Sequence, residues 1–124
     1  MAIKRVLLDA CVPHRLRSVL LSFEVQTAHF AGLERLDDAA LLAAIEGRFD
    51  VLVTLDKGLL LQQKIAGRAF GVVVMRVPVQ TPDIMMTLSS ALIGAINLVV
   101  AGQARVVMQT PGMPGNWTHT SDLA

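Results

Sequence analysis

Two short apolar runs that each end on a single aspartate constrain this chain most. The first lies in residues 3–8 (IKRVLL), is apolar over its last three residues and runs into Asp9, and the second covers the apolar or β-branched residues 51–55 and runs into Asp56. A continuous apolar run of this length, bounded by polar residues, is typical of a strand buried on both faces of a sheet. Parallel strands direct their C-terminal ends to one edge of the sheet, where ligands bind. If the two strands are parallel near neighbours, Asp9 and Asp56 converge at that edge.

The rest of the chain alternates between predicted strands and predicted helices. Further strands are expected at residues 23–29, 69–77 and 104–109, and helices at residues 14–22, 38–47, 57–66 and 82–100. Asp37 or Asp38 is a candidate N-cap of the second helix, and Thr81 followed by Pro82 is a strong start for the fourth. Strict alternation predicts an α/β fold with three layers, α/β/α, around a parallel sheet of four to five strands.

The length of 124 residues predicts one domain. We expect this domain to cover residues 1–110. Residues 111–124 contain prolines and glycines and are expected to form a flexible C-terminal tail.

Composition and charge exclude several classes of protein. The chain has 11 Lys and Arg against 10 Asp and Glu, which excludes a strongly basic nucleic-acid-coating protein but leaves room for a local basic patch. Its one cysteine, Cys11, excludes an internal disulfide and fits a reducing compartment. No secretory signal is visible, and the most apolar stretch, residues 91–101, is about half a membrane span. These features predict a cytoplasmic protein with no membrane contact.

Four carboxylates are expected within reach of the same sheet edge: Asp9, Asp37, Asp38 and Asp56. Carboxylates that lie close together repel one another, so a cation is expected among them. Oxygen ligands favour Mg²⁺ or Mn²⁺ over zinc, as one ion or two. Asp37, Asp38 or Asp56 could instead serve as a helix cap, whereas Asp9 has no obvious structural duty and is the strongest functional candidate.

Basic side chains are also expected near this edge. Arg76 ends the predicted fourth strand, where it could hold a substrate phosphate or balance the aspartates. Arg15, Arg17 and Lys57 could contact a nucleic-acid backbone, although solvated surface positions are the common alternative. The three histidines lack the spacing of metal ligands.

Four segments, in their order and spacing, resemble the small PIN-like nuclease domains, in particular a bacterial branch of unknown function related to VapC-type toxins. These segments are LLDACVP at residues 7–13, GLERLDDAALLAA at 32–44, FDVLVTLDKGLLLQQ at 49–63 and GVVVMRV at 71–77. With the order of the predicted elements, the resemblance covers roughly residues 3–109.

The resemblance implies a Mg²⁺- or Mn²⁺-dependent ribonuclease, with an antitoxin protein or a second copy of the chain as further partner. Asp9 matches the first family acid, Asp38 the middle position and Asp56 the acid after the third strand. The chain departs from the family pattern at Ala10 and Gly58, where many relatives carry an acid. A catalytically depleted PIN-like module that only binds a partner is therefore the alternative.

The residues themselves leave two other functional interpretations open. The spacing from Cys11 to Arg17 matches the Cys-x5-Arg loop of low-molecular-weight tyrosine phosphatases, but Pro13 removes one backbone N–H from that loop. A phosphoacceptor receiver domain needs an acid pair after the first strand, and Ala10 follows Asp9.

Overall fold

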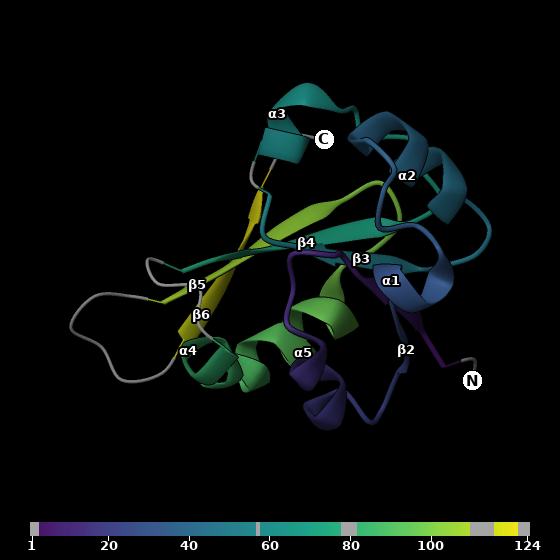
Figure 1. Cartoon of the computed structure of the whole chain (residues 1–124). Coiled ribbons are helices and arrows are strands. Elements are labelled where there is room, and N and C mark those ends of the chain that lie inside the picture. The colour runs from purple at the N-terminus through teal and green to yellow at the C-terminus, as the bar shows by residue number, and fades with distance from the viewer. Residues whose placement is uncertain (1–2, 57, 78–81, 110–115, 122–124) are drawn as a thin grey trace.

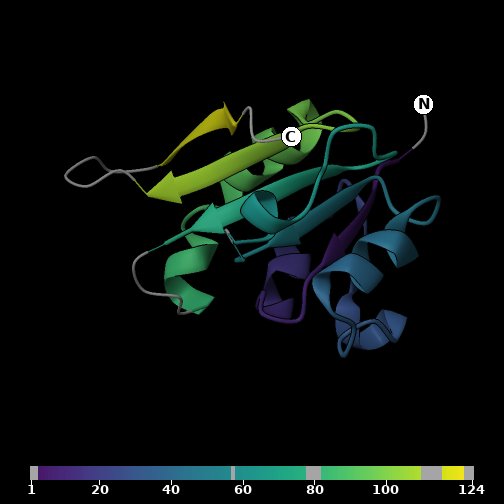
Figure 2. The ribbon, with the colours of Figure 1, turned by 90° about the horizontal axis from the view of Figure 1, so that it is seen from above.

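The computed structural model describes residues 3–56, 58–77, 82–109 and 116–121, with the backbone alone at 109 and 116–121. It has one sheet of six strands (Figures 1 and 2). The strands are β1 Arg5–Leu8, β2 Glu24–Thr27, β3 Val51–Thr54, β4 Gly71–Arg76, β5 Ala104–Gln109 and β6 Asn116–Ser121.

The strands lie in the order β2-β1-β3-β4-β5-β6. The first five are parallel, and β6 runs antiparallel to β5. Strands β1 and β3 are adjacent and central, with Leu8 beside Val53, which confirms the predicted parallel α/β sheet. The order of the strands reverses between β1 and β3, and open α/β sheets bind ligands at such a point, beyond the C-terminal ends of the strands.

The helices are a 3₁₀-helix, η1, at His14–Val19, and α-helices α1 Ala28–Ala31, α2 Asp38–Ile45, α3 Gly58–Gln62, α4 Pro82–Met86 and α5 Ser89–Leu98. Helices α1, α2 and α3 cover one face of the sheet, and α4 and α5 cover the other (Figure 1). Helix η1 packs on the same face as α4 and α5 through Leu16. The structure is therefore a three-layer α/β/α arrangement.

The central strands contribute side chains to both hydrophobic layers, which explains their unbroken apolar sequences. In β1, Val6 and Leu8 pack against the α5 side, whereas Leu7 packs against the α2 side. In β3, Val51 and Val53 face the α5 side and Leu52 the α2 side. Consecutive residues of a strand point to opposite faces, so a strand covered on both faces needs apolar residues throughout.

Several predicted elements differ in detail, among them the helix expected at residues 57–66, which is the shorter α3 at Gly58–Gln62. The expected helix at residues 14–22 is a shorter 3₁₀-helix, and the expected helix at 82–100 is divided into α4 and α5 near Leu88. The strand expected at 23–29 ends at Thr27, because its hydroxyl accepts a hydrogen bond from the backbone N–H of Phe30 at 3.2 Å and starts α1. Gly32, with φ 76°, ends α1 after one turn.

Strand β6 lies within the segment expected to be a tail without regular structure. Its residues pair with β5 from Ala104↔Ser121 to Gln109↔Asn116. Residues 111–115 and 122–124 of that segment lie outside the described residues.

Candidate functional site

The site begins where β1 ends. Asp9 follows Leu8 directly, and its backbone N–H donates to the carbonyl oxygen of Val53 at 2.9 Å. This bond continues the pairing of β1 with β3 and holds Asp9 beside the end of β3. Asp9 is half-buried, and its Oδ1 accepts a hydrogen bond from the N–H of Ala10 at 2.8 Å.

Thr54 joins the ends of the two strands. Its side chain is fully buried, and its hydroxyl donates to Oδ2 of Asp9 at 2.7 Å. The hydroxyl oxygen of Thr54 also accepts a hydrogen bond from the backbone N–H of Asp56 at 3.1 Å. A single hydroxyl therefore fixes the carboxylate after β1 and the backbone that carries the carboxylate after β3.

Asp56 is exposed at this edge and lies beside the start of α3. Its Oδ1 accepts a hydrogen bond from the N–H of Gly58 at 2.9 Å. A Cβ added at Gly58 would lie 3.1 Å from that same oxygen. The glycine therefore lets the first residue of α3 approach the carboxylate closely.

Asp38 lies in the first turn of α2 and is near enough to Asp56 and Asp9 for their charges to act on it. Its own burial raises its pKa, and the negative charges of Asp56 and Asp9, a hydrogen bond with Asp56 and the charge of Asp37 raise it further. The three aspartates predicted to form the site thus influence one another. Asp37 serves as the N-cap of α2, where its Oδ1 accepts from the N–H of Ala40 at 2.8 Å.

The donor atoms suit a hard divalent cation, because carboxylate and hydroxyl oxygens dominate the strand ends. Among the residues that the structure describes, no three His, Cys, Asp or Glu side chains form a group that could hold a metal ion. The arrangement therefore does not provide a cage of three carboxylates. It fits an ion that binds one or two carboxylates directly and keeps several waters, which is the typical coordination of Mg²⁺.

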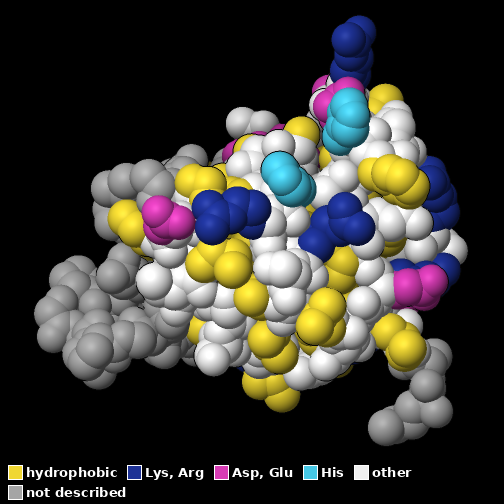
Figure 3. Space-filling model, turned by 60° about the horizontal axis from the view of Figure 1, so that its bottom comes forward, with side chains coloured by type: hydrophobic (Ala, Val, Ile, Leu, Met, Phe, Trp, Pro, Cys, Tyr) yellow, Lys and Arg dark blue, Asp and Glu magenta, His cyan; other side chains and the backbone are white. Residues whose placement is uncertain are grey.

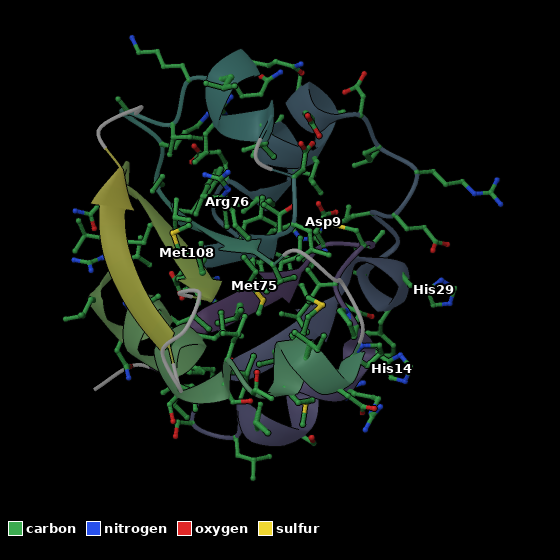
Figure 4. All side chains as sticks on the ribbon, turned by 90° about the vertical axis from the view of Figure 1, so that its left-hand side faces the viewer. Asp9, His14, His29, Met75, Arg76 and Met108 are labelled. Atoms are coloured by element: carbon green, nitrogen blue, oxygen red, sulfur yellow. The ribbon has the colours of Figure 1, made fainter. Side chains whose placement is uncertain are left out.

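The predicted phosphate-binding residues of the sheet edge are only partly described. Arg76 is exposed at the C-terminal end of β4, next to β3, and Figure 4 shows it on the same side of the molecule as Asp9. It makes no ion pair with another described residue. Lys57 lies outside the described residues.

A cleft of about 610 Å³ opens beside Asp9. The loop from Asp9 to Pro13, helix η1 and helix α1 form its walls. Its polar side chains include His14, Arg15, Arg17, His29 and Glu34. In Figure 4 the two histidines lie toward the rim of the molecule and Asp9 nearer the sheet. The volume is within the range of small-molecule and cofactor sites.

Basic side chains extend away from this cleft along η1. His14, Arg15 and Arg17 also line a second, shallower cleft of about 590 Å³, and histidine and basic side chains gather on this face of the molecule (Figure 3). Arg15 lies 3.4 Å from Asp83, and both side chains are exposed, so the pair is weak. Arg17 makes no ion pair within the described segments.

Cys11 is positioned as a partner of the aspartate rather than as a nucleophile. Its sulfur lies 3.8 Å from Oδ2 of Asp9, to which it donates, and 3.9 Å from the hydroxyl of Thr54. Although the residue as a whole is exposed, burial of its sulfur raises the pKa of the thiol, and the charge of Asp9 adds to the rise. A phosphatase needs a cysteine thiolate at neutral pH, so this environment counts against the phosphatase reading.

Sequence reasoning missed two contributors to the site. Thr54 is a hydroxyl residue in an otherwise apolar run, and this interruption could have indicated a polar role for its side chain. His29 and Phe30 enter the cleft through α1, a one-turn helix that is too short to leave a periodic pattern.

Comparison with protein-family models, with curated proteins and with solved structures found no match to this chain. Among the residues that the structure describes, no helix has both the length and the apolar character needed to cross a bilayer.

Proposed function

We propose that this chain is a PIN-like ribonuclease that depends on Mg²⁺ or Mn²⁺ and acts in the cytoplasm as the toxin of a toxin–antitoxin pair. The observation that carries the proposal is the junction of Asp9, Thr54 and Asp56 at the point where the strand order reverses. It supplies hard oxygen donors at the edge where such sheets bind ligands. The choice of RNA, of the PIN-like type and of the toxin role rests on the sequence resemblance.

Asp9 and Asp56 would hold the ion, and Asp38 would complete its surroundings directly or through water. When bound, Mg²⁺ or Mn²⁺ would lower the pKa of a coordinated water and would stabilise negative charge on a phosphate. The hydroxyl of Thr54 keeps one oxygen of Asp9 engaged at 2.7 Å, so the carboxylate is oriented before any ligand arrives.

The basic side chains have a separate task, which is to bind and orient the substrate. Arg76, which is exposed at the end of β4, would contact the phosphate to be cleaved. Lys57, assigned from the sequence alone, would share this role. Arg15 and Arg17 would hold neighbouring phosphates along η1. Hydrolysis then breaks one P–O bond of the backbone, with water contributing a hydroxyl to phosphorus and a proton to the leaving oxygen.

The second candidate function is a PIN-like module that binds a partner protein, or a second copy of itself, without cleaving RNA. The absence of a three-residue metal group in the described residues favours it, and so do the apolar residues at Ala10 and Gly58. In that case the carboxylates at the sheet edge would serve recognition alone.

Cleavage assays separate the two functions. Purified protein is incubated with single-stranded and structured RNA, with Mn²⁺ or with EDTA, beside Asp9→Asn. The proposal expects cleavage that needs Mn²⁺ and falls at least about 100-fold in Asp9→Asn, because a carboxylate that would hold the ion is lost and even the outer-shell partners of metal ligands are worth about 10- to 100-fold. Glu24→Gln is the matched control, since Glu24 is an exposed carboxylate on β2 that lines neither cleft. Cleavage that survives EDTA or Asp9→Asn points to a contaminant, and no cleavage with no bound Mn²⁺ favours the binding module.

A further inference from the structure

An exposed aromatic side chain lies on the wall of the cleft beside Asp9. Phe30 is 78% exposed, although large apolar side chains usually avoid water. Helix α1 holds it there: Ala28 is buried, Thr27 caps the helix start and Gly32 ends it. The position of Phe30 is therefore fixed by its neighbours, and burial of its own ring in the core plays no part.

The same wall carries groups that suit a nucleotide. His29, beside Phe30, is also exposed, with Nδ1 2.9 Å from Oε2 of Glu34. Arg15 and Arg17 on η1 line the same cleft, and so does Asp9, which lies nearer the sheet than the histidines do (Figure 4). An aromatic face, guanidinium groups at its border and the carboxylate of the proposed reaction thus share one hollow of about 610 Å³.

We propose that Phe30 is a stacking platform for a nucleobase and positions a single-stranded segment across this cleft. The phosphates of that segment contact Arg15 and Arg17, and the next linkage reaches the edge at Asp9. The choice of nucleic acid rests on the proposed function, whereas the platform rests on the exposed ring and on the cations beside it. Grooves that bind single strands combine these two elements, because every base has a face that stacks on an aromatic ring.

Charge favours a nucleic-acid strand over an apolar peptide as the occupant. Two guanidinium groups line the cleft that Phe30 enters, and both continue into the second cleft along η1. Asp9 and Glu34 also line the first cleft, but no carboxylate among the described residues lines the second, so a polyanion can follow the guanidinium groups along η1. An apolar peptide would offer these groups no charge. A base-paired strand would keep its bases stacked on each other and leave the ring unused, so the platform distinguishes single strands from duplexes.

Oligonucleotide binding tests this directly, without cleavage. A fluorescein-labelled 12-nucleotide RNA, the same RNA with abasic sites and the corresponding duplex are titrated in EDTA and read by fluorescence anisotropy. Wild-type protein should bind the intact single strand most tightly. Phe30→Ala should weaken that binding about 10-fold, change the binding of the abasic strand by less than about 2-fold, and leave the circular dichroism spectrum unchanged. Phe30→Trp should restore the binding.

The matched control is Leu61→Ala, which removes an equally exposed apolar side chain from α3, away from both clefts. It should bind like wild type. Equal losses for intact and abasic strands, no effect of Phe30→Ala, or no binding by wild type would overturn the platform. So would a change of oligomeric state in Phe30→Ala, by size-exclusion chromatography, with unchanged RNA binding, because that result assigns the ring to a protein interface.

The platform and the proposed function can fail separately. Base-dependent binding through Phe30 without any Mn²⁺-dependent cleavage would keep the platform and reject the nuclease. Cleavage that is lost in Asp9→Asn but has an unchanged KM in Phe30→Ala would keep the nuclease and reject the platform.

Discussion

The hydroxyl of Thr54 donates a hydrogen bond to Oδ2 of Asp9 across 2.7 Å, between residues 45 positions apart in the chain. Thr54 is the one buried polar residue among the described part of the chain. A buried hydroxyl is costly unless it is hydrogen-bonded, and here it both donates to Asp9 and accepts from the N–H of Asp56. This relationship makes the ends of β1 and β3 one rigid unit.

Replacement of Thr54 by valine keeps its shape and removes that hydroxyl. We expect Thr54→Val to lower the free energy of unfolding by about 1–2 kcal/mol, because Asp9 and the N–H of Asp56 both lose a partner. Urea denaturation measures the change. Thr54→Ser is the control and should restore most of the loss. If Thr54→Val unfolds at the same urea concentration as wild type, the two hydrogen bonds contribute nothing to stability.

Lys4 holds the end of α5 at the opposite edge of the sheet. Its ammonium group donates to the carbonyl oxygens of Ile96, Asn97 and Val99, at 2.7, 3.1 and 3.1 Å. These are carbonyls at a helix C-terminus, which lack helical partners and attract positive charge. Lys4→Met should therefore reduce stability by about 1 kcal/mol in thermal denaturation.

The control for Lys4→Met is Lys64→Met, which removes an exposed lysine that follows α3. It should leave the free energy of unfolding within about 0.5 kcal/mol of the wild-type value. Equal effects of the two substitutions would mean that net charge, rather than the contact with α5, is responsible.

Two glycines should respond to alanine in opposite directions. At Gly71 a Cβ would lie 2.7 Å from Cγ2 of Val99 and 2.9 Å from the carbonyl oxygen of Val100, so Gly71→Ala should destabilise by about 2 kcal/mol. At Gly94, in the middle of α5, a Cβ meets nothing within 4 Å. Gly94→Ala should stabilise by up to about 1 kcal/mol, because alanine favours the helix. Urea denaturation of both variants tests this, and effects of the same sign would contradict the packing at Gly71.

The sequence was sufficient to predict the parallel sheet, because residues 6–8 and 51–53 are apolar without a break and strands covered on both faces need that pattern. The N-cap at Asp37 was also predictable, since aspartate before an apolar helix accepts from its free N–H groups. Both features depend on residues that are close in the chain or on a strong local pattern.

Other features depend on contacts that no local pattern carries. The division of α4 from α5 occurs without a proline or glycine at Thr87 or Leu88, so nothing in the sequence marks it. Strand β6 follows β5 through a segment rich in proline and glycine, and its pairing depends on the exposed edge of β5. The partnership of Thr54 with Asp9 needs the register of β1 with β3, which only the folded sheet defines.

The raised pKa of Asp38 leads to a prediction about metal-free protein. Its burial, together with the charges of Asp56 and Asp9, makes the folded state bind a proton at Asp38 more readily than the unfolded chain does. The ionised carboxylate therefore costs stability above the folded pKa, and this cost disappears as the pH falls through it. The start of α2 partly offsets the cost, since a helix N-terminus favours negative charge.

Asp38→Asn removes that ionisation. In EDTA at pH 7 the variant should be more stable than wild type, by no more than about 1 kcal/mol because solvent screens this partly exposed group. Near pH 3, where the wild-type carboxyl is protonated, the difference should vanish. Added Mn²⁺ should raise the melting temperature of wild type more than that of Asp38→Asn, because the ion offsets the repulsion that the variant already lacks. A variant that is less stable than wild type at pH 7 in EDTA would show that Asp38 supports the fold and is not repelled by Asp9 and Asp56.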